Sequence, residues 1–257
     1  MTPTPDEPDH EQKNRAFWDA DADAYQELHA ADLDRAEAWG AWRIPESEIG
    51  ALQLDHIAGR DVLEFGCGAA QWSSAIAARD ARARGLDLSI AQLRHAQRRM
   101  EDGAHAVPLV CASASAVPFA DASFDVVFCD HGALSFCDPN VAVAECARLL
   151  RDGGRLVFCL ATPLVYLTYD AARDRQTRKL VNRWEAEWRF DAIEGTIDFV
   201  WSAGAWIRVF RRNGFEIDDL IELVPPDGAR TTYTDFVPSK WARRWPAEQI
   251  WCVTRRR

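Results

Sequence analysis

The feature that most constrains the fold is a regular alternation of short apolar runs with helical segments between residues 61 and 160. The apolar runs predict five strands, at Asp61–Phe65, Arg84–Leu88, Leu109–Cys111, Phe124–Cys129 and Arg155–Leu160. Ser89 precedes a helical segment and has Gln92 three residues later, which is capping-box spacing. Strands that alternate with helices at this spacing predict an α/β fold with a parallel sheet covered on both faces.

The segments outside this alternation have different patterns. Residues 1–12 are rich in proline, threonine and acids and predict a disordered leader, whereas residues 14–57 have a helical pattern. Residues 162–200 carry aromatic residues among many charges, and the regular pattern returns with a helix at 203–213 and strands at 215–223 and 249–254.

Composition excludes several classes of protein. The formal net charge of −10 disfavours a nucleic-acid partner, which would need a basic face. The seven cysteines include no C-x-x-C pair, so we expect neither a disulfide framework nor a zinc site. Cysteines without such a pattern indicate that the protein is located in the reducing cytoplasm. No apolar run approaches 18 residues and the N-terminus has no secretory pattern, so we expect no membrane span and a cytoplasmic location.

The first strand of the alternation ends in a glycine turn, Gly66-Cys67-Gly68, just before a helix. Glycine lets a ligand approach bare backbone, and the helix N-terminus adds unpaired N–H groups. Asp87 closes the second strand, where an acid can accept hydrogen bonds from both ribose hydroxyls. A glycine turn alone is also compatible with a simple tight turn, but with the acid it predicts a nucleoside-containing ligand.

Two positions bear on which nucleoside is bound. A dinucleotide-binding turn would have a third glycine where this chain has Gln71. Glu64, two residues before Gly66, is poorly suited to a pyrophosphate but suits a ligand with an ammonium group. These residues oppose a nucleotide-dependent oxidoreductase.

Five segments, in this order, resemble the motifs of the class I, seven-strand methyltransferases that use S-adenosylmethionine (SAM). The resemblance is broadly to the group that includes the ubiquinone and menaquinone biosynthesis methyltransferases. It covers residues 58–160 well, and it rests on Glu64–Gly68, Gly85–Ser89, Val117–Phe119, Ser123–Val127 and Leu149–Leu156.

The resemblance implies a doubly wound, mostly parallel seven-stranded sheet with helices on both faces and an antiparallel last strand. It divides the chain into a helical N-terminal lid at 13–57 and a SAM-binding methyltransferase domain at 58–257, with a helical, aromatic cap inserted at about 162–200. In many relatives an Asp after the third strand binds the adenine, and the aligned residue here is Ser113. The expected cofactor contacts are Glu64, Gly66, Cys67, Gly68, Asp87, Leu88, Ser113, Ala114, Asp130, Trp18 and Tyr25.

Methyl transfer from a sulfonium mainly requires alignment of the reactants and exclusion of water, and a base only if the acceptor must lose a proton. His131, after the fourth strand, is the candidate general base, and its alternative role is to anchor the loop or line the cofactor site. No acid follows the fifth strand, where Ala161-Thr162-Pro163 stands, and the other histidines form no ligand grouping, so we expect no metal.

The sequence predicts a small, partly apolar acceptor, with O-methylation favoured and S-adenosylhomocysteine as the second product. The alternative is a non-catalytic SAM-binding regulator or partner protein, in which bulky residues fill the acceptor site. Aromatic residues at or near the cap are the candidate acceptor contacts: Tyr166, Tyr169, Trp184, Trp188 and Trp206.

Overall fold

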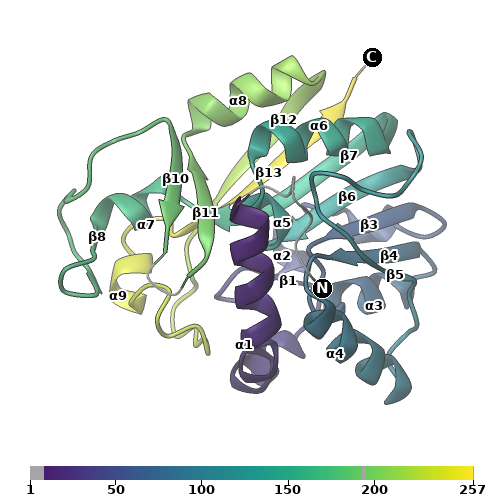
Figure 1. Ribbon diagram of the computed structural model, residues 1–257, viewed down its shortest axis with the longest axis horizontal. Coiled ribbons are helices and arrows are strands. Elements are labelled where there is room, and N and C mark those ends of the chain that lie inside the picture. The colour runs from purple at the N-terminus through teal and green to yellow at the C-terminus, as the bar shows by residue number, and fades with distance from the viewer. Residues whose placement is uncertain (1–8, 193–194, 257) are drawn as a thin grey trace.

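The computed structural model describes residues 9–192 and 195–256, and its centre is one twisted sheet (Figure 1). The strand order is β12-β13-β7-β6-β3-β4-β5, and only β13 runs antiparallel to its neighbours. The predicted seven-stranded fold with an antiparallel last strand is confirmed. Its strands are β3 (Asp61–Phe65), β4 (Arg82–Asp87), β5 (Leu109–Cys111), β6 (Phe124–Asp130), β7 (Leu150–Ala161), β12 (Phe215–Leu223) and β13 (Glu248–Arg255).

Helices cover both faces of the sheet because the strands alternate their side chains between two cores. One core contains Val62 and Phe128 with the apolar sides of α3 (Gln71–Ala77) and α4 (Ile90–Glu101). The opposite core contains the buried faces of α6 (Pro139–Leu149) and α8 (Ala203–Arg212), with the short α5 (Ala133–Phe136) nearby. None of the helices in the two described ranges has the length and apolarity needed to cross a membrane.

The N-terminal segment begins with a long helix and continues through short elements. Residues 1–8 of the expected leader lie outside the described residues. The remainder of that prediction is wrong, since Asp9–Gln12 form the first turn of α1, where His10 packs edge-on against Phe199 and Asp9 pairs with Arg189. The elements are α1 (Asp9–Leu33), β1 (Ala38–Trp39), β2 (Ile44–Pro45), α2 (Glu46–Ile49) and η1 (Leu54–His56).

The described part of the cap insertion, without residues 193–194, contains one helix and two small antiparallel sheets, so it is less helical than predicted. Residues 187–191 alternate charged with aromatic side chains, a period of two that suits a strand. The cap elements are α7 (Pro163–Thr168), β8 (Tyr169–Asp170), β9 (Arg175–Gln176), β10 (Glu187–Asp191) and β11 (Ile197–Trp201). The helix α9 (Ser239–Ala242) follows later, in the connection between β12 and β13.

Candidate cofactor and acceptor site

The candidate site lies where the strand order reverses, between β3 and β6. In an open α/β sheet, this switch point at the carboxyl ends of the strands is where ligands bind. Gly66 follows β3 with φ 89°, and a Cβ there would lie 2.4 Å from the backbone nitrogen of Ala133 and 2.8 Å from Cα of Gly132. Glycine at residue 66 therefore allows the loops after β3 and β6 to meet.

Glu64 holds the start of the helix that follows the glycine turn. Its carboxylate accepts hydrogen bonds from the backbone N–H of Ser73 at 2.8 Å and from Ser73 Oγ at 2.5 Å. Ala70, at the N-cap of α3, has no side chain that could do this. Burial raises the pKa of Glu64 to about 8, although the hydrogen bonds from Ser73 work in the opposite direction. A cationic group bound beside Glu64 would favour the ionised carboxylate again.

Asp87 joins the glycine turn to the end of the second parallel strand. One carboxylate oxygen accepts from Gly68 N at 2.8 Å and the other from Ser89 N at 2.8 Å. Burial raises the pKa of Asp87 and these backbone hydrogen bonds oppose that shift. Each oxygen accepts one backbone bond and has a further lone pair, which is the capacity that a ribose diol requires.

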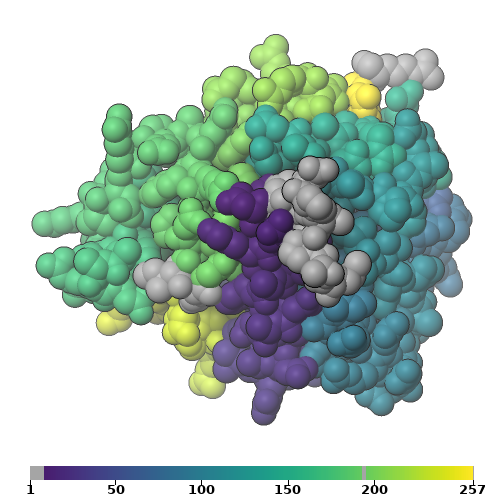
Figure 2. Space-filling view, viewed as in Figure 1, coloured from purple at the N-terminus to yellow at the C-terminus, as the bar shows by residue number. Residues whose placement is uncertain are grey.

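Helix α1 lies across this edge of the sheet, and it is exposed at the surface between the cap and the β3–β5 half of the molecule (Figures 1 and 2). Asp19 accepts hydrogen bonds from Ser89 Oγ and Ala91 N at the start of α4, and Gln26 bonds both Gln71 and Gln92. Between α1 and the ends of β4 and β5 is a cavity of about 230 Å³. It is lined by Gln12, Arg15, Ala16, Asp19, Leu88, Ile90, Cys111 and Ala112.

A charged network lies beyond the end of β6. Asp130 accepts from Arg43 at 3.2 Å and from Gly40 N at 3.0 Å, and the Arg43 and Asp130 side chains are both buried. His131 Nε2 lies 2.6 Å from Oε1 of Glu248, a residue on the antiparallel strand β13. Burial works to lower the pKa of His131, but the hydrogen bond to Glu248 and the surrounding acids outweigh it and raise the pKa above its ordinary value.

Comparison with known proteins shows which proteins this region resembles. Residues 63–158 match the family model described as a methyltransferase domain. This part of the chain therefore resembles a methyltransferase domain. It is 33% identical over 146 residues to demethylmenaquinone methyltransferase of Thermobifida fusca, and 36% identical over 121 residues to ubiquinone biosynthesis O-methyltransferase of Aromatoleum aromaticum.

These alignments cover 56% and 44% of this chain, and 59% and 52% of the relatives' own lengths. The chain therefore spans little more than half of the curated relatives that it matches. A solved geranyl diphosphate methyltransferase, in complex with GPP and sinefungin, superimposes with a TM-score of 0.67 at 16% identity. That superposition covers 96% of this chain and 99% of the other, and at such low identity it shows the fold alone.

The fold brings most of the predicted cofactor residues to one edge of the sheet. Leu88 lines the cavity, whereas Ser113 bonds Ser115 and Ala114 is buried in a core, and neither is among the described residues that line the cavity. Cys67 is buried beside Gly85. The contacts of Leu88, Ser113, Ala114 and Cys67 with a cofactor therefore stay predictions.

The two aromatic residues predicted for the lid do lie on α1, over the domain. The Trp18 ring packs edge-on against Phe136 and Tyr25, and the Tyr25 hydroxyl lies 2.9 Å from that of Tyr233. Both rings thus pack against neighbouring side chains, and their contact with a cofactor stays a prediction.

The aromatic residues predicted for the acceptor pocket separate into three environments. Tyr166 and Trp188 are half-buried neighbours, and Tyr166 donates a hydrogen bond to Asp198 at 3.0 Å. Tyr169 bonds Asp174 within the β8–β9 sheet, and Trp184 is 56% exposed. For Trp206 the pocket prediction is wrong: it is fully buried on α8 against Phe158 of β7, because the apolar face of an amphipathic helix must pack on the sheet.

The sequence analysis misses Glu248 and Arg43, the partners of His131 and Asp130. Each lies more than 80 positions from its partner, so no local motif joins them. The available signal was an acid just before the apolar run of the last strand, Ile250–Val253. A buried charge requires a partner, and a strand position of this kind points to one.

Two groups of possible metal donors lie together among the described residues, although the sequence shows no such grouping. In the first, Asp130, His131 and Cys159, the acid pairs with Arg43 and the imidazole bonds Glu248, so these residues form a hydrogen-bonded network. The second consists of His10 and Glu11, in the first turn of α1, and Cys137, directly after α5.

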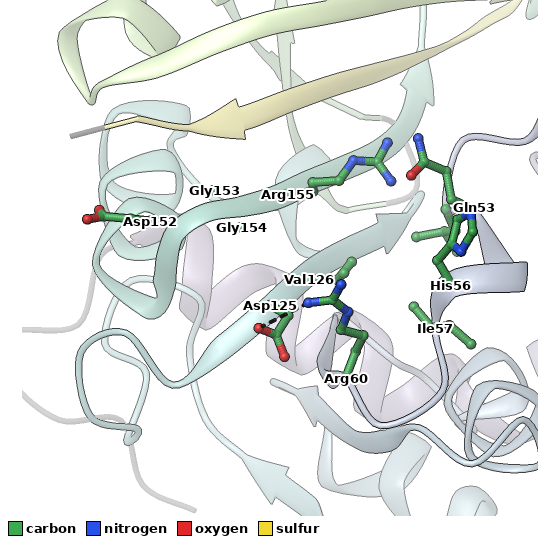
Figure 3. A pocket seen from close by; sticks show the side chains of 11 residues that line it. Gln53, His56, Ile57, Arg60, Asp125, Val126, Asp152, Gly153, Gly154 and Arg155 are labelled. Carbon is green, nitrogen blue, oxygen red and sulfur yellow. Dashed lines mark ion pairs between the residues drawn. The ribbon is translucent and has the colours of Figure 1, made fainter.

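A second cavity, of about 150 Å³, lies at the opposite edge of the sheet (Figure 3). It is bordered by the segment before β3 and by the first half of β7, with Arg60 paired to Asp125 at 4.0 Å and Arg155 extending toward Gln53. None of the predicted site residues lines it. Because ligands of parallel sheets bind at the carboxyl ends of the strands, we assign it no role in the reaction.

Proposed function

We propose that this chain is a SAM-dependent methyltransferase that methylates a hydroxyl group on a small, partly apolar molecule. The observation that carries the proposal is the meeting of Glu64, the Gly66–Gly68 turn and Asp87 at the strand switch point, with His131 on the adjoining loop. The ubiquinone biosynthesis O-methyltransferase among the relatives supports an oxygen acceptor. The net charge of −10 supports a small molecule over a nucleic acid.

The residues present fit SAM, which would supply a methyl group on a sulfonium, activated for in-line displacement. Asp87 would accept hydrogen bonds from the ribose, and Leu88 would pack on the adenine in the cavity next to α1. Glu64, whose carboxyl is buried beside bare backbone, would favour the ammonium end, directly or through the turn that it holds. Helix α1 would exclude water from the bound ligand.

On the acceptor side, His131 would remove the hydroxyl proton as the methyl group is transferred. The hydrogen bond to Glu248 and the nearby acids outweigh burial and raise the pKa of His131 above its ordinary value, which makes the ring a stronger base. We also propose that the transfer needs no metal, because no acid follows β7 to complete a ligand set with Asp130. Activity that survives a chelator would support this, and loss that is restored by a divalent metal would oppose it.

The first test is a thermal-shift comparison of SAM, S-adenosylhomocysteine and NAD. Stabilisation by the first two and not by NAD is expected, and the reverse would reject the proposal. The second test uses SAM labelled in the methyl group and a panel of phenols, alcohols, amines and carboxylic acids. Transfer to a hydroxyl compound is expected.

The second candidate is a SAM-binding protein without catalytic activity. The packing of Phe136 against Trp18 favours it, because these rings occupy space between α1 and the β6 loop. SAM binding without transfer to any member of the panel or to a crude metabolite extract would support this candidate.

A further inference from the structure

His131 and Glu248 form a pair in which one side chain is accessible and the other is not. The imidazole is 32% exposed, whereas the Glu248 side chain is 1% exposed. Glu248 therefore contacts an acceptor only through His131. Their bond joins Nε2 to Oε1 at 2.6 Å, which is short for an N–H···O contact and typical of a charge-assisted one.

The turn that contains Gly40 and Ala41 holds Glu248 in place. Ala41 N donates to the same oxygen, Oε1, at 2.7 Å. Gly40, with φ 67°, lies directly against the carboxylate, since a Cβ at that position would be 2.3–2.8 Å from the three carboxylate atoms. The carboxylate is thus fixed by residues that are distant in sequence, and its orientation does not depend on the loop that carries His131.

The backbone of His131 is also fixed in an unusual conformation. Its φ of 51° lies in the left-handed region, and its N–H donates to Cys159 O at 3.0 Å. A residue with a side chain adopts this conformation at a cost in free energy, and such residues gather at functional sites. The Phe236 ring lies edge-on to the imidazole, with 5.8 Å between the ring centroids.

An ionised carboxylate only accepts hydrogen bonds, so the nitrogen that faces Glu248 must carry the proton. In a neutral imidazole the lone pair is then on Nδ1. Among the described residues, no hydrogen bond involves Nδ1 of His131. Because Nε2 is held by the buried Glu248 and the imidazole is 32% exposed, Nδ1 is the nitrogen left to accept a proton.

We propose that Glu248 is a positioning residue for the reaction, which fixes His131 in the Nε2–H form and so makes Nδ1 the base that takes the acceptor proton. This inference rests on the proposed function. In the step, the acceptor oxygen forms a bond to the methyl carbon as the carbon–sulfur bond breaks. The acceptor proton passes to Nδ1, giving imidazolium, and the sulfonium leaves as neutral sulfide.

The charged groups that face His131 belong to three strands. Glu248 on β13, Asp130 at the end of β6 and Asp198 on β11 all favour imidazolium, and Arg43 offsets Asp130 through their ion pair. Within residues 9–192 and 195–256, Glu248 is the side chain that is hydrogen-bonded to the ring. Replacement of Glu248 by Gln keeps the shape and removes the charge, so it isolates the contribution of this residue.

The decisive measurement is the nitrogen NMR spectrum of the six histidines in the full chain as a function of pH, with H131Q used to assign His131. We expect neutral His131 to carry its proton on Nε2 and to have a pKa above that of an exposed histidine. In E248Q the pKa of His131 should fall. A neutral wild-type ring protonated on Nδ1, or a His131 titration that E248Q leaves unchanged, would overturn the inference.

The second readout is the pH–rate profile of methyl transfer. We expect E248Q to lower kcat by about 10–100-fold, with SAM affinity and acceptor KM little changed, and to move the acidic limb of the profile to lower pH. A merely structural ion pair would alter thermal stability and leave the limb in place. If E248Q does not fold, the tautomer of the wild-type ring still decides the question.

The two proposals fail in different ways. If the wild-type chain does not bind SAM, the proposed function fails, whatever the tautomer of His131. If the chain binds SAM and transfers methyl groups but His131 is protonated on Nδ1, only the role of Glu248 fails.

Discussion

The two halves of the candidate site are built in different ways. The cofactor half comes from neighbouring segments, since Glu64 bonds Ser73, nine residues away, and Asp87 bonds Gly68, 19 residues away. The acceptor half joins distant residues, with Glu248 117 positions from His131 and Arg43 87 positions from Asp130. The first half uses mostly backbone donors, and the second uses pairs of charged side chains.

This difference shows where each half is vulnerable. The cofactor half consists mostly of backbone groups, so it depends on glycine conformations and on the N-termini of helices that follow the strands. The acceptor half depends on the contacts that the turn at Gly40–Arg43 makes with Asp130 and Glu248. A buried charge that loses its partner destabilises the folded state. Substitutions in the cofactor half should therefore alter SAM binding, and those in the acceptor half should alter turnover.

The largest effect is expected for His131→Ala. Loss of a general base should lower kcat by about 10²–10⁴-fold while the Kd for SAM changes less than about twofold. Single-turnover transfer and calorimetric SAM titration measure the two quantities. His105→Ala, at an exposed position, is the control. An equal loss of SAM affinity would instead make His131 a cofactor contact.

Asp87→Ala should have the next largest effect, on binding. Loss of two hydrogen bonds to a charged acceptor, at about 1.5 kcal/mol each, predicts about 100-fold weaker SAM binding. Isothermal titration checks this, with thermal unfolding to confirm that the variant folds. Asp121→Ala removes a carboxylate that is 78% exposed and should leave the affinity unchanged. Unaltered affinity in the Asp87 variant would remove the main support for the cofactor site.

Glu64→Gln should give a smaller, pH-dependent effect. The pKa of about 8 lies above the ordinary 4.5, so the folded state binds more protons between these values and loses stability as pH rises through them. The Gln variant does not undergo this loss, so the Tm of E64Q minus the Tm of wild type should increase from pH 5 to pH 8. SAM binding should weaken about tenfold because the negative charge is lost.

Glu216→Gln, at an exposed position, is the control for Glu64→Gln. The result that contradicts the interpretation is a Tm difference between E64Q and wild type that stays the same at both pH values.

The smallest effect on the site is expected for Asn14→Ala. Asn14 is 1% exposed. Its side chain donates to Phe136 O and Ile197 O and accepts from Ile197 N, so it connects α1 with α5 and with β11 of the cap. Its loss should cost about 2 kcal/mol, increase hydrogen exchange in α1 and weaken SAM binding only a few-fold. Lys13→Ala breaks an exposed ion pair nearby and should change little. Unchanged exchange in α1 would show that Asn14 does not hold the helix.

Much of the cofactor half was predictable because its signals are local. The apolar runs and the capping residue Ser89 gave the parallel strands and the start of α4, where Ser89 Oγ accepts from Gln92 N as expected. The alternation in residues 187–191 was a strand signal that aromatic composition concealed. Trp206 was misassigned because an aromatic residue on an amphipathic helix suits a core as well as a pocket.

By itself, the sequence determined the α/β fold and the glycine turn with its two acids, because hydrophobic period and backbone conformation are properties of neighbouring residues. Only the tertiary structure decided that Glu248 faces His131 and that Arg43 pairs with Asp130. These pairs form when the antiparallel β13 and the turn after β1 reach the end of β6. Since contacts across more than 80 residues leave no periodic trace in a single chain, folding alone brings them together.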